Sequence, residues 1–240
     1  METNNILITN DDGIKADGLI RLAQTAKEFG NVWVVAPSIE SSASSHSITL
    51  RHSMEIHPYD FPIEGVKAYS LTGTPADCIR VGIRYVMKDK PDIVMSGINS
   101  GYNMATDIQY SATAGAAFEA VFQGIKAIAF SEHFFGEHEV TERYLRELMA
   151  ELIKEPFVPG QIINVNFPGC TLEECKGVLR DRKVSQLVYY EDQYDELKKF
   201  DDGGAEIMVR GVHEPATEEG TDYAAVLGNY VSVGRVNNIG

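Results

Sequence analysis

Two adjacent carboxylates, Asp11 and Asp12, follow directly after a short apolar run, residues 6–8, and precede Gly13. Such a run is typical of a buried strand, and a glycine suits a tight turn. In an open α/β sheet, ligands bind just beyond the carboxyl ends of the strands. The pair therefore indicates a cation site at that edge. The same residues also suit an ordinary turn or helix cap, so the pair alone leaves both interpretations open.

Two later segments place oxygen-bearing side chains just after further predicted strands. Ser42 lies in a serine-rich stretch, residues 38–47, after an apolar run at 32–36. This stretch also suits a flexible polar loop, and its His46 is a candidate proton carrier. Asn99 follows an apolar run at 92–95 and occupies the serine position of a Gly-x-Ser-x-Gly spacing. A carboxamide is no nucleophile there, but its oxygen is a good neutral ligand for a hard cation.

Oxygen-only ligation predicts which metal this set could hold. Carboxylate, amide and hydroxyl ligands favour Mg²⁺, Mn²⁺ or Ca²⁺ over zinc or copper. Such an ion, held by four protein groups, keeps about two coordination positions for water and a phosphate oxygen. It would reverse the repulsion between the two carboxylates and a phosphate dianion and lower the pKa of a bound water. One aspartate would then bind the metal while the other orients or deprotonates the attacking water.

The phosphate itself needs donors, and a helix N-terminus supplies them. Ser111 and Thr113 begin a predicted helix and are equally candidates for capping it. Together with Asn10 and Asn99 they are the residues we expect to contact phosphate or substrate. The sequence contains neither the glycine-lysine loop of P-loop proteins nor a dinucleotide-binding glycine motif after the first strand.

Composition limits the class of protein further. The 240 residues carry a net charge of −14, which argues against binding to duplex nucleic acid through a basic surface. No apolar stretch is long enough for a membrane span, and the polar N-terminus lacks a signal pattern, so we expect a cytoplasmic protein without membrane contact. The three cysteines are an odd number, which favours reduced thiols over a disulfide framework.

The predicted elements that must position these residues alternate between strand and helix through residue 167. This pattern predicts an α/β core of three layers, with a mainly parallel sheet between helices. The rhythm changes after Pro168. Residues 184–190 and 205–210 are expected to form a hairpin around an acidic stretch, followed by a short helix at 223–227 and a strand at 230–233. We therefore divide the chain into a core, 1–167, and a small β-rich extension, 168–240, that packs on the core or on another subunit.

Several of these stretches resemble the SurE family, the survival-protein nucleotidases. The similar segments are residues 6–13, 34–37, 42–49, 72–78, 96–103, 110–116, 220–226 and 230–233, in order along nearly the whole chain. The resemblance implies a Rossmann-like fold and a divalent-metal-dependent phosphatase for nucleoside 5′- and 3′-monophosphates. It implies one Mg²⁺ or Mn²⁺ held by Asp11, Asp12, Ser42 and Asn99. It further implies a homodimer or homotetramer in which C-terminal extensions are often exchanged.

Two departures from the family pattern concern Ala112, where glycine is more common, and the chain's end soon after Val233. The substitution at Ala112 affects how the backbone at Ser111 approaches phosphate, and the early end of the chain affects the contacts between subunits.

Two other functions stay open. A receiver-type signalling domain also places acidic residues after its first strand, but it needs a phosphoacceptor aspartate and a lysine that are not obvious here. A non-catalytic, Mg²⁺-dependent nucleotide-binding protein would keep the same ligands.

Overall fold

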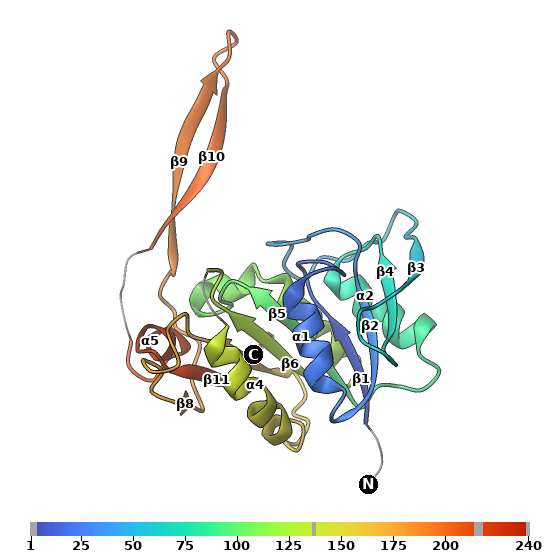
Figure 1. The fold of residues 1–240 in the computed structure, drawn as a ribbon. Coiled ribbons are helices and arrows are strands. Elements are labelled where there is room, and N and C mark those ends of the chain that lie inside the picture. The colour runs from blue at the N-terminus through green and yellow to red at the C-terminus, as the bar shows by residue number, and fades with distance from the viewer. Residues whose placement is uncertain (1–3, 136–137, 214–217, 239–240) are drawn as a thin grey trace.

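A nine-stranded sheet runs through the centre of the molecule (Figure 1). The computed structural model describes residues 4–135, 138–213 and 218–238. The parallel part of the sheet contains, in spatial order, β4 (Lys67–Leu71), β2 (Gly30–Pro37), β1 (Asn4–Thr9), β5 (Ile93–Ser100), β6 (Lys126–Glu132) and β7 (Gln161–Phe167). At one edge β3 (Ile56–Tyr59) pairs antiparallel with β4. At the other edge β11 (Val231–Asn237) pairs antiparallel with β7 and parallel with β8 (Val178–Leu179).

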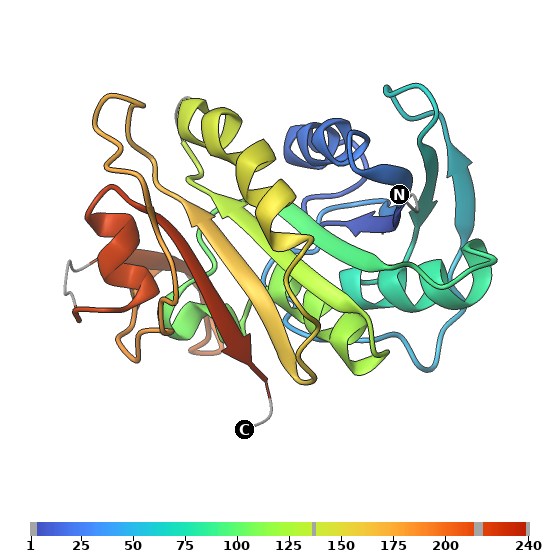
Figure 2. The same cartoon turned by 90° about the horizontal axis from the view of Figure 1, so that it is seen from below.

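Helices cover both faces of this sheet, as Figure 2 shows. One face packs against α1 (Asp17–Ala26) and α4 (Glu139–Leu152), and the other against α2 (Pro75–Val81) and α3 (Ala112–Phe122). The alternation of strand side chains explains the two cores: Ile6 and Ile8 face the α1 side, whereas Leu7 between them faces the α2 side. The three-layer α/β core predicted from the sequence is confirmed. A π-helical turn (Gly82–Val86) extends α2, and a 3₁₀ turn (Ala105–Gln109) precedes α3.

Local sequence signals account for several helix ends. Thr74 begins α2 with a capping box, in which its hydroxyl accepts from the amide of Asp77 and the Asp77 carboxylate accepts from the amide of Thr74. Pro75 occupies the first turn, where its missing N–H costs nothing. Ser111 caps α3, and Thr221 caps α5 (Asp222–Leu227), each accepting a hydrogen bond from a backbone amide.

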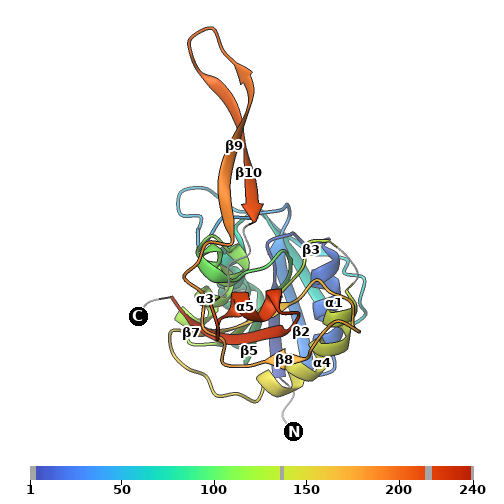
Figure 3. The same ribbon diagram turned by 90° about the vertical axis from the view of Figure 1, so that its left-hand side faces the viewer.

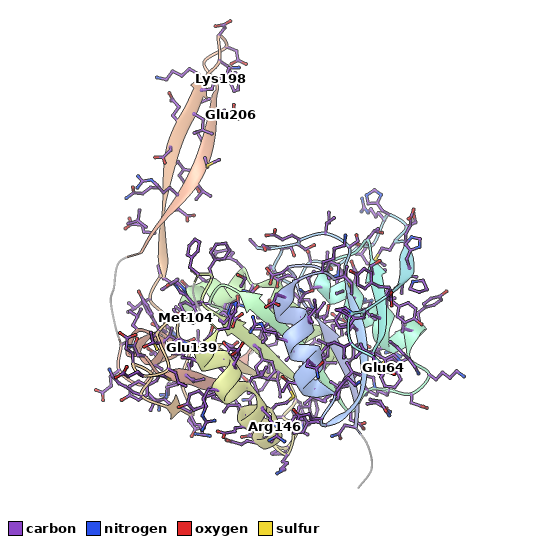
Figure 4. All side chains as sticks on the ribbon, in the orientation of Figure 1. Glu64, Met104, Glu139, Arg146, Lys198 and Glu206 are labelled. Carbon is purple, nitrogen blue, oxygen red and sulfur yellow. The ribbon has the colours of Figure 1, made fainter. Side chains whose placement is uncertain are left out.

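The predicted hairpin exists, but its first strand begins later in the chain than the sequence predicts. Strand β9 is Tyr190–Lys199, so the acidic stretch expected to be a loop is itself a strand, paired with β10 (Ala205–His213). This two-stranded sheet projects away from the body (Figure 3), and Lys198 and Glu206 lie near its far end (Figure 4). Residues 191–199 of β9 are all exposed in the part of the chain that the structure describes, so β9 lacks the apolar alternation by which a half-buried strand is normally recognised.

The C-terminal segment also contributes to the main sheet. Strand β11 lies beside β7, with Ser232 opposite Asn166 and Val236 opposite Ile162. Residues 168–240 are therefore not all peripheral to the core, and it is the β9–β10 hairpin that stands apart (Figure 1).

The strand order creates the position for a site. From β1 the chain moves outward through β2 to β4, and then crosses back to β5 on the other side of β1. The order therefore reverses between β1 and β5. In open α/β sheets the crevice at such a reversal, beyond the carboxyl ends of the strands, is where ligands bind.

Candidate active site

Asp11 and Asp12 lie at this reversal, directly after β1. The Asp11 side chain is only 4% exposed, and its carboxylate accepts a hydrogen bond from the Thr113 hydroxyl. The Asp12 carboxylate accepts from the backbone amide of Ser100, at the end of β5, over 3.2 Å. The two aspartates thus connect the end of the first strand to the start of α3 and to the end of β5.

The serine-rich stretch reaches the same place through its backbone. The amide of Ser41 donates to the carbonyl oxygen of Asp11 over 2.8 Å. Ser42 is exposed, and its hydroxyl donates to a carboxylate oxygen of Glu40 over 2.8 Å. Burial is the main cause of the raised pKa of both Asp11 and Asp12, and the negative charge of Glu40 adds a smaller contribution to each. The stretch that carries Ser42 therefore contacts the aspartate pair through the backbone of Ser41.

Asn99 adjoins the residue that binds Asp12. It is nearly buried, and its amide nitrogen donates to the carbonyl oxygen of Gly101 over 2.7 Å. That bond occupies the nitrogen, so the amide oxygen is the end of this side chain that can bind a cation. The structure therefore brings the segments that carry Asp11, Asp12, Ser42 and Asn99 to one edge of the sheet.

The electrostatics of this edge favour a cation. Burial raises the pKa of Asp11 from 3.8 to about 7, although the Thr113 hydrogen bond offsets part of the effect. Burial also raises the pKa of Asp12, with further contributions from the charges of Glu40 and Glu132. A divalent ion would neutralise such a group of carboxylates.

An unpaired polar atom points to the same conclusion. Within the described residues, the side-chain oxygen of Asn10 is buried without a hydrogen-bond partner, directly before the two aspartates. A buried acceptor without a partner costs about 1–3 kcal/mol, and a ligand or ion is one means of satisfying it. Oxygen ligands of this kind fit a hard cation such as Mg²⁺ or Mn²⁺.

The other predicted phosphate contacts already have structural roles. The amide nitrogen of Asn10 donates to the carbonyl oxygen of Gly13 over 2.9 Å. The Ser111 oxygen accepts from the amide of Ala114 over 2.9 Å, which leaves its hydroxyl proton available to a phosphate. Thr113 is fully buried and gives its single hydroxyl proton to Asp11. Thr113 is therefore a support for Asp11 in this structure, and its contact with phosphate stays a prediction.

Two acidic residues that contact segments of this site were not anticipated from the sequence. Glu132 ends β6 and accepts hydrogen bonds from Arg21 and Thr141, and its charge reaches Asp12. Glu119 is buried on α3 and binds His46 over 2.9 Å and Arg80 over 3.1 Å. The sequence signal for Glu132 was its position close to the end of a predicted strand. Glu119 lies mid-helix on a side that only the fold identifies as buried.

Glu119 also fixes the orientation of His46. The imidazole lies 5.5 Å from the Phe122 ring in a stacked arrangement, in addition to its hydrogen bond to Glu119. These contacts join the serine-rich stretch to α3. The role of His46 as a proton carrier stays a prediction.

Comparison with known proteins identifies the family to which this chain belongs. The profile of the family described as "Survival protein SurE" matches residues 6–188. The chain belongs to the SurE family. A "5'-nucleotidase SurE" of Thermosipho melanesiensis is 37% identical over 231 residues, covering 95% of this chain and 89% of the relative. A "5'-nucleotidase SurE" of Caldanaerobacter subterraneus is 38% identical over 240 residues, covering 97% of this chain and 91% of the relative.

A solved structure extends the similarity to three dimensions. The crystal structure of the SurE protein of Aquifex aeolicus superposes with a TM-score of 0.80 at 33% identity. The match covers 97% of this SurE chain and 93% of the Aquifex chain.

Among the described residues, no cluster of three or more histidine, cysteine, aspartate or glutamate side chains is arranged for a metal. A ligand set in which serine and asparagine accompany two aspartates would not form such a cluster. None of the helices described here is both long and apolar enough for a membrane span.

Proposed function

We propose that this protein hydrolyses nucleoside 5′-monophosphates, and 3′-monophosphates, to nucleoside and phosphate, using one divalent cation, Mg²⁺ or Mn²⁺. The observation that carries the proposal is the aspartate pair at the sheet's reversal point: buried Asp11 accepts a hydrogen bond from Thr113 of α3, and Asp12 accepts one from the amide of Ser100 in β5. The relatives named "5'-nucleotidase SurE" support the choice of substrate.

Each residue has a proposed task. Asp11, Asp12, Ser42 and Asn99 would hold the cation, which when bound polarises a phosphoryl oxygen and offsets the negative charge of the site. One of the two aspartates orients or deprotonates the attacking water. Asn10, Asn99, Ser111 and Thr113 would contact the phosphate or substrate, and the amide groups at the start of α3 would help to hold the phosphate.

We propose a cytoplasmic homodimer or homotetramer, without binding to nucleic-acid duplexes. The net charge of −14 supports the last point. The hairpin supports self-association because it exposes apolar side chains over more than half of their surface: Tyr194, Leu197, Ile207, Met208 and Val209. Replacing residues 191–212 by a short turn should reduce the assembly to monomers in light scattering after size exclusion. An unchanged mass would contradict the role of the hairpin.

The central test is phosphate release from a panel of nucleoside monophosphates. The protein is first treated with EDTA, and Mg²⁺ or Mn²⁺ is then restored. We expect release only with the metal and with nucleotides preferred over simple phosphomonoesters. Metal-dependent nucleotide binding without any release would instead identify the non-catalytic alternative.

A further inference from the structure

Two exposed phenylalanines follow β6 at the same edge of the sheet as the aspartate pair. Phe134 is 61% exposed and Phe135 is 73% exposed. Their rings meet edge to face, with centroids 4.5 Å apart. Adjacent rings held in water are unfavourable unless something covers them, so they mark a binding surface.

The position of these rings relative to the candidate metal ligands follows from the strand register. Asn99 pairs with Ser131, and Ser100 pairs with Glu132, across β5 and β6. Phe134 comes two residues after Glu132. At about 3.3 Å per residue and 4.8 Å between strands, the backbone of Phe134 lies at most about 11 Å from that of Asn99. This separation is comparable with the span of a ribose between a phosphate and its base.

Packing behind the pair holds it in place. The ring of His133 lies 6.4 Å from that of Phe135 and 5.4 Å from that of Tyr102, and the amide of Phe135 donates to Nδ1 of His133 over 3.1 Å. The Tyr102 hydroxyl accepts from the amide of Gly169 over 2.7 Å. A Cβ on Gly169 would collide with His133, so the backbone at Gly169 packs directly against the imidazole. The aromatic row thus connects the exposed pair to the segments after β5 and β7.

The charge of the surroundings limits what could bind there. Glu132, two residues before Phe134, is paired with Arg21, but the carboxylates of Asp11, Asp12 and Glu40 leave this edge acidic. A second anionic group would be repelled, whereas a flat, neutral ring system can stack on phenylalanine. We propose that Phe134 and Phe135 form the nucleobase subsite of this enzyme, on which the base of the substrate stacks. This inference rests on the proposed nucleotidase function.

The test compares two substrates that share a phosphate ester but differ in the base. Adenosine 5′-monophosphate carries a base, and ribose 5-phosphate does not. In the double variant F134A/F135A, the KM for adenosine 5′-monophosphate should rise about tenfold, since stacking on one aromatic ring is worth that order of affinity. The KM for ribose 5-phosphate and the melting temperature should not change, because both rings are exposed.

Three further variants separate stacking from simple apolar contact. F134L/F135L keeps apolar bulk without a ring and should behave like the alanine variant, whereas F134Y/F135Y should keep a KM near that of the wild type. Y85A is the matched control: Tyr85 is 77% exposed on the turn Gly82–Val86, before β5, at the opposite edge of the sheet. The Y85A substitution should leave the KM for adenosine 5′-monophosphate and the KM for ribose 5-phosphate unchanged.

Several outcomes would overturn the inference. An unchanged KM for adenosine 5′-monophosphate, an equal rise for both substrates, or full recovery by leucine would each exclude base stacking. A changed assembly size of F134A/F135A in size exclusion would show that another subunit covers the rings. A wild-type protein that hydrolyses neither compound would instead overturn the proposed function, and the inference with it.

Discussion

Replacing Asp11 by asparagine should abolish hydrolysis and at the same time stabilise the metal-free protein. Asp11 is 4% exposed, and burial raises its pKa from 3.8 to about 7. An ionised carboxylate at this position therefore opposes folding when no cation is bound. Asparagine has nearly the same shape, and its amide oxygen can still accept the hydrogen bond from Thr113.

The size of the effect follows from the pKa. A pKa raised from 3.8 to about 7 corresponds to about 4 kcal/mol of destabilisation once the group is fully ionised in the folded state. The folded pKa lies above the unfolded one, so this penalty is absent below pH 3.8, grows as the pH rises, and is complete above about pH 7. D11N removes the penalty. For a chain of this length we expect a melting temperature higher by about 10 °C at pH 8 and little change near pH 4.

The measurement is thermal unfolding in EDTA at both pH values, together with metal-dependent phosphate release. D12N is the matched control. Asp12 is less buried, and it accepts a backbone hydrogen bond from Ser100 that an asparagine oxygen can preserve. It should lose activity as well but gain less stability. D11N protein with wild-type activity would refute the catalytic assignment. A D11N protein less stable than wild type at pH 8 would refute the reasoning about burial.

Three further substitutions test the supports of the site. T113V removes the hydroxyl that donates to Asp11 and should cost roughly 1–3 kcal/mol in urea unfolding of the metal-free protein at pH 8; no loss would contradict the bond's importance. Burial would raise the pKa of Glu119, but hydrogen bonds and a nearby guanidinium hold that pKa below 4.5. E119Q should therefore be less stable than wild type at neutral pH and equal to it once the pH falls well below 4.5, and a pH-independent difference would exclude this linkage. In G115A the new Cβ would lie 2.6 Å from the carbonyl oxygen of Ser45 and displace the serine-rich stretch. A metal titration should then show half-maximal activity at a higher Mg²⁺ concentration, and an unchanged midpoint would mean that this stretch does not position a ligand.

The sequence by itself determined the features that depend on neighbouring residues. The apolar run at residues 6–8 is a buried strand, as expected from its local pattern. The residue types after the strands already indicated hard-cation chemistry. Because parallel strands present their carboxyl ends at one edge, a βαβ rhythm was also sufficient to expect these residues at a common edge.

Only the tertiary structure decided which polar groups are already occupied by protein contacts. Ser111 and Thr113 have similar hydroxyls two positions apart, yet Thr113 donates to Asp11, whereas Ser111 accepts from a backbone amide. Glu119 binds His46, which is 73 positions away in the sequence. No local pattern encodes such pairs, since they depend on how helices and loops pack together.

The C-terminal segment also shows the difference between what local sequence determines and what the tertiary structure decides. Strand β9 (Tyr190–Lys199) is acidic throughout much of its length and extends from the body, so no burial pattern marks it as a strand. Strand β11 (Val231–Asn237) has an ordinary apolar signal, but its place beside β7 depends on a return across the sheet. The sequence by itself determined the types of ligand and the rhythm of the core, because both are set by short-range chemistry. The pairing partners and the burial of Asp11 were decided only by contacts between distant segments.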